Sequence, residues 1–267
     1  MKTVKMQGGL GNQLFCLAFA HSVARIARSA VALDLSAFGA DRHGRAFDLR
    51  DLALSVGDFH FVERPLMSAR VTTALMRALP LPGYVSETRP PETPLELAAL
   101  IACGDYFNGY WQDERYVADP DAFIEHTRRF AFERAAAAPA RAVVIHYRTY
   151  KEEVRPENRR VPGGAYFREA LARIEVRMGP QTEILLVSDD PILAMERIGD
   201  IGRPIRPVTG GGAWDDMALL MRARVLILSN SSFSWWGGFC GEAELTIYPR
   251  RDGFFHYPAP AARFLCL

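Results

Sequence analysis

Residues 225–238 read VLILSNSSFSWWGG. The apolar run Val225–Leu228 predicts a buried strand, and the serine-rich turn after it predicts the start of a helix. Such a turn offers free backbone N–H groups, and the positive end of the helix dipole adds to them, so that an anion can be held there. We interpret Trp235 and Trp236 as the wall of a partly apolar pocket beside the anion. The stretch therefore predicts a binding site at the end of a strand in an α/β protein.

The same alternation of strand and helix runs through the rest of the chain. Apolar runs typical of parallel strands, and helical stretches between them, recur in both halves. The strands are expected at 3–6, 30–35, 105–111, 141–148, 183–188, 225–228 and 245–248, and the helices at 12–28, 119–138, 164–178, about 191–199 and 215–224. This pattern predicts two Rossmann-like domains, residues 1–138 and 139–267.

Composition excludes several classes of protein. The 32 basic and 31 acidic side chains nearly cancel, which argues against a nucleic-acid partner. The four cysteines lie far apart with no C-x-x-C spacing, so we expect reduced thiols and no zinc site. The N-terminal Met1–Met6 runs at once into a glycine loop, unlike a signal peptide, and no apolar run is long enough to span a membrane. We therefore expect a cytoplasmic protein that touches the inner face of a membrane only through its substrate.

A glycine loop, Gly8–Gly11, joins the first expected strand to the first expected helix. It resembles part of a dinucleotide fingerprint, because Asp34 ends the next strand, where an acid would bind a ribose. However, Leu14 stands where that fingerprint requires its last glycine. A tight turn for helix packing and a direct contact with a ligand explain the loop equally well.

Residues 146–153, HYRTYKEE, follow a second strand. His146 and Arg148 are two positions apart and should project to the same side, where a guanidinium can bind a diphosphate. Glu152 or Glu153 is close enough in sequence to act as a general base. A surface run of charges with a hydrogen-bonded core histidine is an equally good interpretation.

The vicinal acids Asp189 and Asp190 follow a third strand and precede Pro191. They could accept hydrogen bonds from a base or a sugar, or bind a metal. Helix capping is the alternative, with Ser188 or Asp189 as the N-cap ahead of Pro191, and we expect it for at least one of them. We interpret the pair Asp215–Asp216 in the same way.

In chain order, these segments resemble the α-1,2-fucosyltransferases of glycosyltransferase family 11, in particular the bacterial ones. The segments that carry the resemblance are Gly8–Phe15, Gly109–Tyr116, Ser188–Pro191 and Asn230–Gly238. The resemblance implies a GT-B fold, with two Rossmann-like domains facing each other across a cleft, the first on the acceptor side and the second binding the nucleotide sugar.

The resemblance also implies a reaction. An inverting enzyme would transfer L-fucose from GDP-L-fucose to a hydroxyl, expected to be the 2-OH of galactose, of an oligosaccharide or lipid-linked glycan in bacterial polysaccharide or O-antigen synthesis. It would need no metal and no cofactor besides the donor. Arg148 would stabilise the leaving phosphate, and Glu152 or Glu153 would be the base. The expected donor-binding residues are His146, Asp189, Asp190, Asn230, Ser231, Ser232, Phe233, Gly9, Gly11 and Asn12.

One segment departs from the family pattern His-x-Arg-Arg-x-Asp. Thr149 replaces the second arginine and Lys151 replaces the acid, which leaves the identity of the base open. Two rival functions therefore stay open: transfer of a related deoxysugar from its own nucleotide, and a non-catalytic relative that binds a sugar nucleotide or glycan. A third, an NAD-dependent dehydrogenase, is disfavoured by Leu14.

Overall fold

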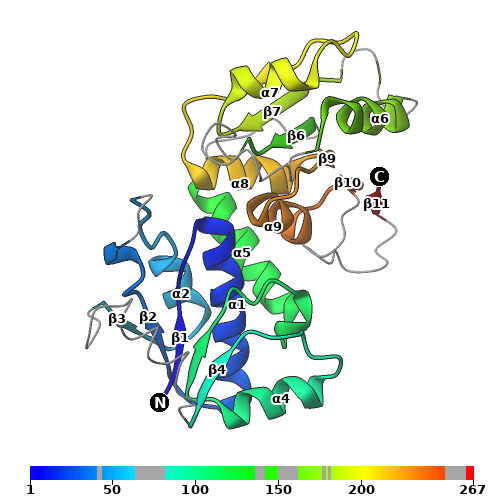
Figure 1. Ribbon diagram of the computed structural model, residues 1–267. Helices are drawn as coiled ribbons and strands as arrows, with labels where there is room; N and C mark the ends of the chain where they lie inside the picture. Colours follow the sequence, from blue (N-terminus) through cyan, green and yellow to red (C-terminus); the bar gives the residue numbers. More distant parts are fainter. Residues whose placement is uncertain are drawn as a thin grey trace. The chain divides into compact units, whose positions relative to one another are not determined.

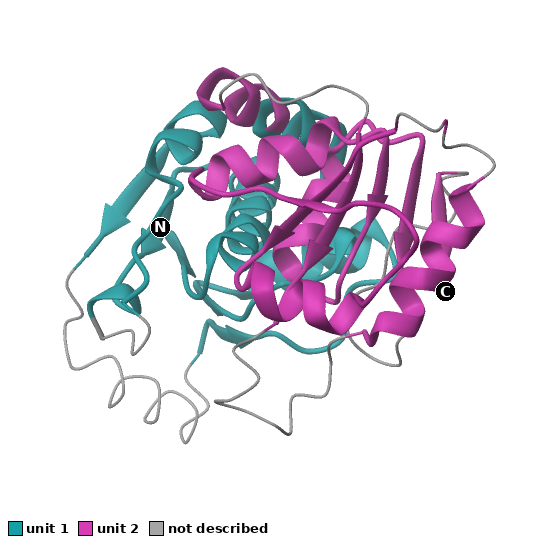
Figure 2. Cartoon of the chain, turned by 90° about the horizontal axis from the view of Figure 1, so that it is seen from above, with its two compact units in different colours: residues 1–127 teal, residues 128–267 magenta. Residues whose placement is uncertain are grey.

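The structure is a computed structural model that describes residues 1–40, 44–63, 82–135, 142–149, 162–175, 179, 182–249 and 263–267. The chain forms two compact units, Met1–Thr127 and Arg128–Leu267 (Figure 2). The division falls inside helix α5 (Pro120–Arg134), whereas the sequence pattern predicts it after this helix, at 138/139. The second half of α5 packs within unit 2, because Arg128 Nε donates to the Cys240 carbonyl at 2.8 Å and Phe130 lies edge-on against Trp214.

Unit 1 is built on a parallel sheet with the strand order β3-β2-β1-β5-β4 (Figure 1). Its strands are β1 (Lys2–Lys5), β2 (Val31–Asp34), β3 (Phe59–Val62), β4 (Tyr84–Ser86) and β5 (Tyr106–Asn108). Besides α5, its helices are α1 (Leu10–Ala27), η1 (Phe38–Ala40), α2 (Arg50–Val56), α4 (Pro94–Cys103) and η2 (Glu114–Tyr116). The apolar helix α1 packs on β1 and β2, and its Phe19 stacks on Trp111 with the ring centroids 4.0 Å apart.

Unit 2 contains a second parallel sheet, in the order β11-β10-β9-β6-β7-β8. Its strands are β6 (Val143–Tyr147), β7 (Ile184–Ser188), β8 (Arg206–Pro207), β9 (Val225–Ile227), β10 (Leu245–Tyr248) and β11 (Phe264–Cys266). Its helices are α6 (Gly164–Ile174), α7 (Pro191–Ile198), α8 (Ala213–Arg222) and α9 (Ser232–Cys240). Alternate strand residues pack on α6 and α7 at one face and on α8 at the other, which explains the near-continuous apolar runs.

The α/β fold and the central strands of both sheets are confirmed. The expected turn at Gly8–Gly11 is wrong in its second half, because α1 already begins at Leu10. Among the glycines of this loop, only Gly8, with φ of 83°, needs the left-handed backbone conformation that glycine tolerates. The ends of two expected helices, at 136–138 and 176–178, lie outside the described residues. No helix in the described ranges is both long and apolar enough to cross a membrane.

Candidate functional site

The candidate site of unit 2 lies where β6, β7 and β9 end. The three strands are neighbours, and their register pairs Tyr147 with Ser188 and Ile145 with Ile227. Arg148, Asp189 and Ser229 therefore follow at the same edge of the sheet. Ligands of parallel α/β sheets bind beyond this carboxyl edge.

The Ser229 hydroxyl joins the end of β6 to the turn before α9. Its Oγ lies 3.0 Å from His146 Nδ1 and accepts a hydrogen bond from the Arg148 backbone N–H at 3.1 Å. The Ser229 side chain is fully buried. Ser229, a residue that we did not assign from the sequence, thus bonds both the His146 ring and the Arg148 backbone.

Asp189 holds the residues after β6 in place. One carboxylate oxygen accepts the Thr149 backbone N–H at 2.8 Å, and the other lies 3.5 Å from Arg148 Nε. The Arg148 side chain keeps 41% of its surface exposed, against 13% for Asp189. The guanidinium is therefore oriented by the carboxylate while much of it stays accessible to a ligand.

The serine turn caps α9. The Ser231 hydroxyl accepts the Phe233 backbone N–H at 3.3 Å, and the buried Ser234 hydroxyl donates to the carbonyls of Ser229 and Ser231. Asn230 and Ser231 are buried, and Ser232 begins the helix. The positive end of α9 therefore lies beside His146, whose ring centroid is 5.6 Å from that of Phe233.

The two tryptophans do not form the wall of a pocket, and that expectation is wrong. Both are fully buried, and Trp235 stacks on Phe239 with the centroids 4.4 Å apart. A Cβ at Gly237 would lie 2.7 Å from the Leu220 Cβ, so glycine is needed there for α9 to approach α8. The Trp-Trp-Gly-Gly sequence is thus explained by the packing of the core.

His146 is an uncharged ring at neutral pH. Its side chain is almost fully buried, and this burial, together with the Arg148 charge, lowers the pKa of His146 to about 3. A neutral imidazole has one N–H donor and one nitrogen acceptor. The ring can therefore bind a ligand oxygen without carrying a charge.

Two further acids of unit 2, Asp190 and Asp215, lie at helix starts. Asp190 is the N-cap of α7, where its carboxylate accepts the Leu193 backbone N–H at 3.0 Å. The segment caps a helix, as expected, but the N-cap is Asp190 and not Ser188 or Asp189. Asp215 accepts the Gly212 N–H at 2.8 Å at the start of α8, and burial raises the pKa of its neighbour Asp216 to about 6. Glu152, Glu153 and Lys151 lie outside the described residues.

The glycine loop of unit 1 is bonded mainly to its own unit. Gly9 is the N-cap of α1, Gly11 is buried in its first turn, and Asn12 Oδ1 accepts from Gln112 Nε2 at 2.7 Å. The fully buried Gln13 donates to the carbonyls of Gly8 and Ala46 and accepts the Asp48 N–H. These bonds fix the loop against the segment before α2.

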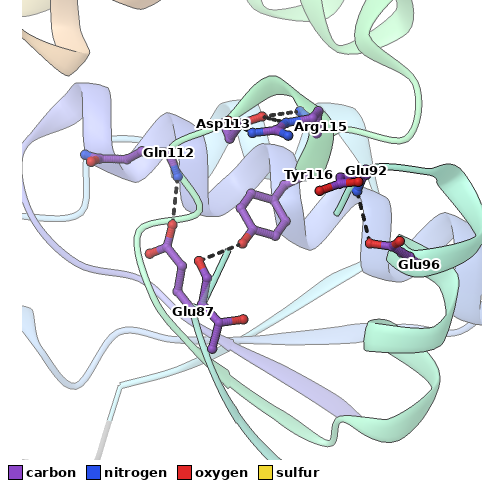
Figure 3. Close-up of polar contacts among 8 residues, drawn as sticks. Glu87, Glu92, Glu96, Gln112, Asp113, Arg115 and Tyr116 are labelled. Carbon is purple, nitrogen blue, oxygen red and sulfur yellow. Dashed lines mark hydrogen bonds and ion pairs between the residues drawn. The ribbon is translucent and has the colours of Figure 1, made fainter. Parts of the chain in front are cut away.

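The segment Gly109–Tyr116 is folded around Glu87 (Figure 3). The Glu87 carboxylate accepts the backbone N–H groups of Tyr110 and Gln112 at 2.6 and 3.1 Å. Figure 3 also shows Asp113 beside Arg115, whose Nε and terminal nitrogen both donate to the carboxylate at 2.8 Å. The family-like segment after β5 is thus fixed by a glutamate that we did not single out from the sequence.

One signal in the sequence marks Ser229, and none marks Glu87. Ser229 directly follows the apolar run Val225–Leu228, which marks it as the end of a strand, although no local pattern gives its bonding partner. Glu87 lies in a proline-rich stretch without apolar periodicity, and no pattern pointed to it.

Possible metal ligands and thiols are the remaining reactive groups of the described ranges. No group of three or more His, Cys, Asp or Glu side chains there is arranged to hold a metal ion. The four cysteines, all of them described, are free thiols. Burial raises the pKa of the Cys16 thiol to about 12, which keeps it protonated.

Comparison with known proteins gives both a fold and a family. The E. coli heptosyltransferase WaaC with ADP-2-deoxy-2-fluoro heptose is 10% identical, with a TM-score of 0.50 over 100% of this chain and 93% of that one. The α-1,6-fucosyltransferase NodZ soaked with GDP-fucose is 14% identical (TM-score 0.45, 90% and 91% covered), and POFUT1 with GDP is 11% identical (TM-score 0.44, 92% and 98% covered).

The likeness to WaaC bears on the fold alone, and it agrees with the predicted GT-B type of two Rossmann-like units. Among curated proteins, no sequence matches the chain. The model of Glycosyl transferase family 11 matches residues 102–250, which include β6, β7, β9 and the start of α9. The chain belongs to glycosyltransferase family 11 and is a glycosyltransferase.

Proposed function

We propose that this enzyme transfers L-fucose from GDP-L-fucose, with inversion, to a hydroxyl of a glycan acceptor. The observation that carries the proposal is the cluster around Ser229. There the Arg148 backbone, the His146 ring and the start of α9 meet at the carboxyl edge of the unit 2 sheet, and Asp189 lies 3.5 Å from the Arg148 guanidinium. A guanidinium and a helix N-terminus are the groups that bind a diphosphate best. Membership of family 11 supports the choice of a nucleotide sugar.

In the proposed reaction, an acceptor oxygen attacks the anomeric carbon of fucose from the side opposite GDP. The bond from this carbon to the β-phosphate oxygen breaks, and its electron pair stays on that oxygen. Arg148 and the first N–H groups of α9 stabilise the negative charge, while Asp189 orients Arg148 through the contact at 3.5 Å. Glu152 or Glu153 would take the acceptor proton.

The other proposed donor contacts come from the start of α9, from Asp190 and from the glycine loop of unit 1. Asn230, Ser231, Ser232 and Phe233 form the turn and the first residues of α9, and we propose that they line the nucleotide site. Asp190 lies beside Asp189 but already caps α7, so its contribution would be secondary. We propose that Gly9, Gly11 and Asn12 add the contacts of unit 1, and that unit 1 binds the acceptor.

We also propose the conditions, the acceptor and the location of the reaction. We expect activity without a metal, on an oligosaccharide or lipid-linked acceptor at the cytoplasmic face of a bacterial membrane, with the galactose 2-OH as the attacking group. These expectations rest on the family resemblance of the sequence.

Turnover assays with a panel of nucleotide sugars test the proposal. The purified chain should release GDP from GDP-fucose only when a galactose-terminated acceptor is present, and EDTA should not change the rate. The panel should include other deoxysugar nucleotides, because Thr149 replaces the second arginine of the family pattern. Thr149 is fully buried, and one guanidinium remains where the family has two. Turnover with another donor alone would replace fucose, and GDP binding without turnover on any acceptor would indicate a non-catalytic relative.

A further inference from the structure

The hydrogen bonds of Ser229 determine which nitrogen of His146 carries the proton. The Arg148 backbone N–H can only donate, so Ser229 Oγ is the acceptor of that bond. Ser229 is fully buried, and in the described part of the chain the only other polar group that bonds its hydroxyl is His146 Nδ1. The hydroxyl proton therefore has one acceptor available, the lone pair of Nδ1.

A neutral imidazole whose Nδ1 accepts must carry its proton on Nε2. His146 is neutral, because burial and Arg148 hold its pKa far below the usual range. Nε2 has no hydrogen-bond partner among the described residues, and it is not one of their polar atoms that are both fully buried and unpartnered. The ring is thus almost completely buried, yet it presents one N–H donor at the surface of the site.

We propose that Ser229 is a positioning residue that fixes His146 as the Nε2–H tautomer, so that the ring donates a hydrogen bond to a phosphate oxygen of the bound nucleotide beside Arg148. The identity of the ligand rests on the proposed function, whereas the tautomer rests on the contacts of Ser229 alone. The other tautomer would turn the lone pair of Nε2 toward the anion and repel it.

The same oxygen also holds the backbone of Arg148. Ser229 Oγ contacts the ring of His146 at 3.0 Å and the Arg148 N–H at 3.1 Å, so one hydroxyl sets two phosphate donors. Loss of this hydroxyl should disturb both donors, while loss of a neighbouring buried hydroxyl should disturb neither.

Nitrogen-15 NMR of histidine-labelled protein without nucleotide tests the tautomer. His146→Gln identifies the His146 signals among those of the six histidines. The wild-type ring should show a protonated Nε2 and an unprotonated, hydrogen-bonded Nδ1 from about pH 5 to 8, a range in which an ordinary histidine titrates. A protonated Nδ1, or an equal mixture of the two forms, would overturn the proposal without the need for any variant.

Two serine variants test the role of the hydroxyl. In Ser229→Ala the ring should lose its preference for Nε2–H, and GDP affinity measured by calorimetry should fall by about tenfold, as expected for one weakened hydrogen bond to a charged group. Ser234→Ala is the matched control, because this hydroxyl is equally buried in the same turn but donates to the carbonyls of Ser229 and Ser231. It should keep the Nε2–H ring. If Ser229→Ala keeps both the tautomer and the affinity, Ser229 has no positioning role.

The two measurements separate this inference from the proposed function. An Nε2–H ring in a wild-type protein that does not bind GDP would overturn the proposed function, and with it the phosphate contact. An Nδ1–H ring in a protein that binds GDP and transfers fucose would overturn the inference alone.

Discussion

Two loops at the carboxyl edges of the two sheets differ in the polar groups that lie beside them. In unit 1 the glycine loop before α1 is bonded to its surroundings by Gln13 and Asn12, and its N-cap Gly9 has no side chain to offer. In unit 2 the serine turn before α9 caps the helix with Ser231 and leaves His146 Nε2 without a partner among the described residues. Both loops bond their own side chains within the protein, and the difference is the neutral ring of His146 beside the start of α9, whose N–H can bind an anion together with the helix N-terminus.

We propose that unit 2 binds the phosphates of the donor, and Arg148→Ala is the variant expected to affect this binding most. Transfer measured as kcat/KM should fall by about 10²–10³, the usual effect of removing one preorganised donor to a developing anion. Circular dichroism should be unchanged, because 41% of the side chain is exposed and it contributes little packing. Arg173→Ala, which removes an exposed arginine paired with Glu169 on α6, should retain full activity. Full activity of Arg148→Ala would place the leaving phosphate elsewhere.

Ser231→Ala tests whether the start of α9 contributes to GDP binding. We expect a loss of about 1 kcal/mol in the free energy of unfolding, because the cap of α9 is removed, together with a fall of about tenfold in GDP affinity. The control is Thr93→Ala, which removes the same kind of cap from α4 in unit 1. It should lose similar stability in urea unfolding with GDP affinity unchanged. Equal effects of both variants on GDP affinity would show that the serine turn has no direct role.

His146 should also give the protein a pH-dependent stability. Its pKa is lowered from 6.5 to about 3, so between these values the unfolded state binds a proton that the folded state does not. Stability should therefore fall as the pH decreases through this range, and His146→Gln should show a shallower slope in urea unfolding. His21, whose pKa burial also lowers, should account for a residual slope. An unchanged slope in His146→Gln would mean that the ring is not kept neutral by the fold.

The smallest effect is expected in the glycine loop. Asn12 Oδ1 already accepts from Gln112, so Asn12→Ala should raise the KM for the donor by less than Ser231→Ala does. A steady-state KM for both variants is the measurement. A larger effect of Asn12→Ala would show that unit 1 contributes more to donor binding than unit 2.

The central strands were predictable from the sequence, and the edge strands were not. β6, β7, β9 and β10 are buried on both faces, which requires continuous apolar runs that are visible in the chain. The four strands that we did not predict, β3, β4, β8 and β11, are the edges of the two sheets. An edge strand is covered less and can be short and mixed in composition, as the Arg206–Pro207 pair of β8 shows.

The chemistry of the site was partly predictable for a related reason. His146 lies near the end of β6, and Arg148 and Asp189 directly follow β6 and β7. Parallel strands end at a common edge, so their meeting could be expected. The prediction that the tryptophans form the wall of a pocket was wrong. A rare residue in a motif suggests contact with a ligand, whereas Trp235 and Trp236 fill the core. The bonds of Ser229 depend on the relative heights of two strands that lie far apart in the sequence, and no local pattern encodes them.

A crystal structure of the protein with GDP tests the central claim most directly. The account predicts the diphosphate at the start of α9, with its oxygens within hydrogen-bond distance of the Arg148 guanidinium, His146 Nε2 and the first backbone N–H groups of the helix. A diphosphate bound away from Arg148 and α9, for example at the glycine loop of unit 1, would contradict it.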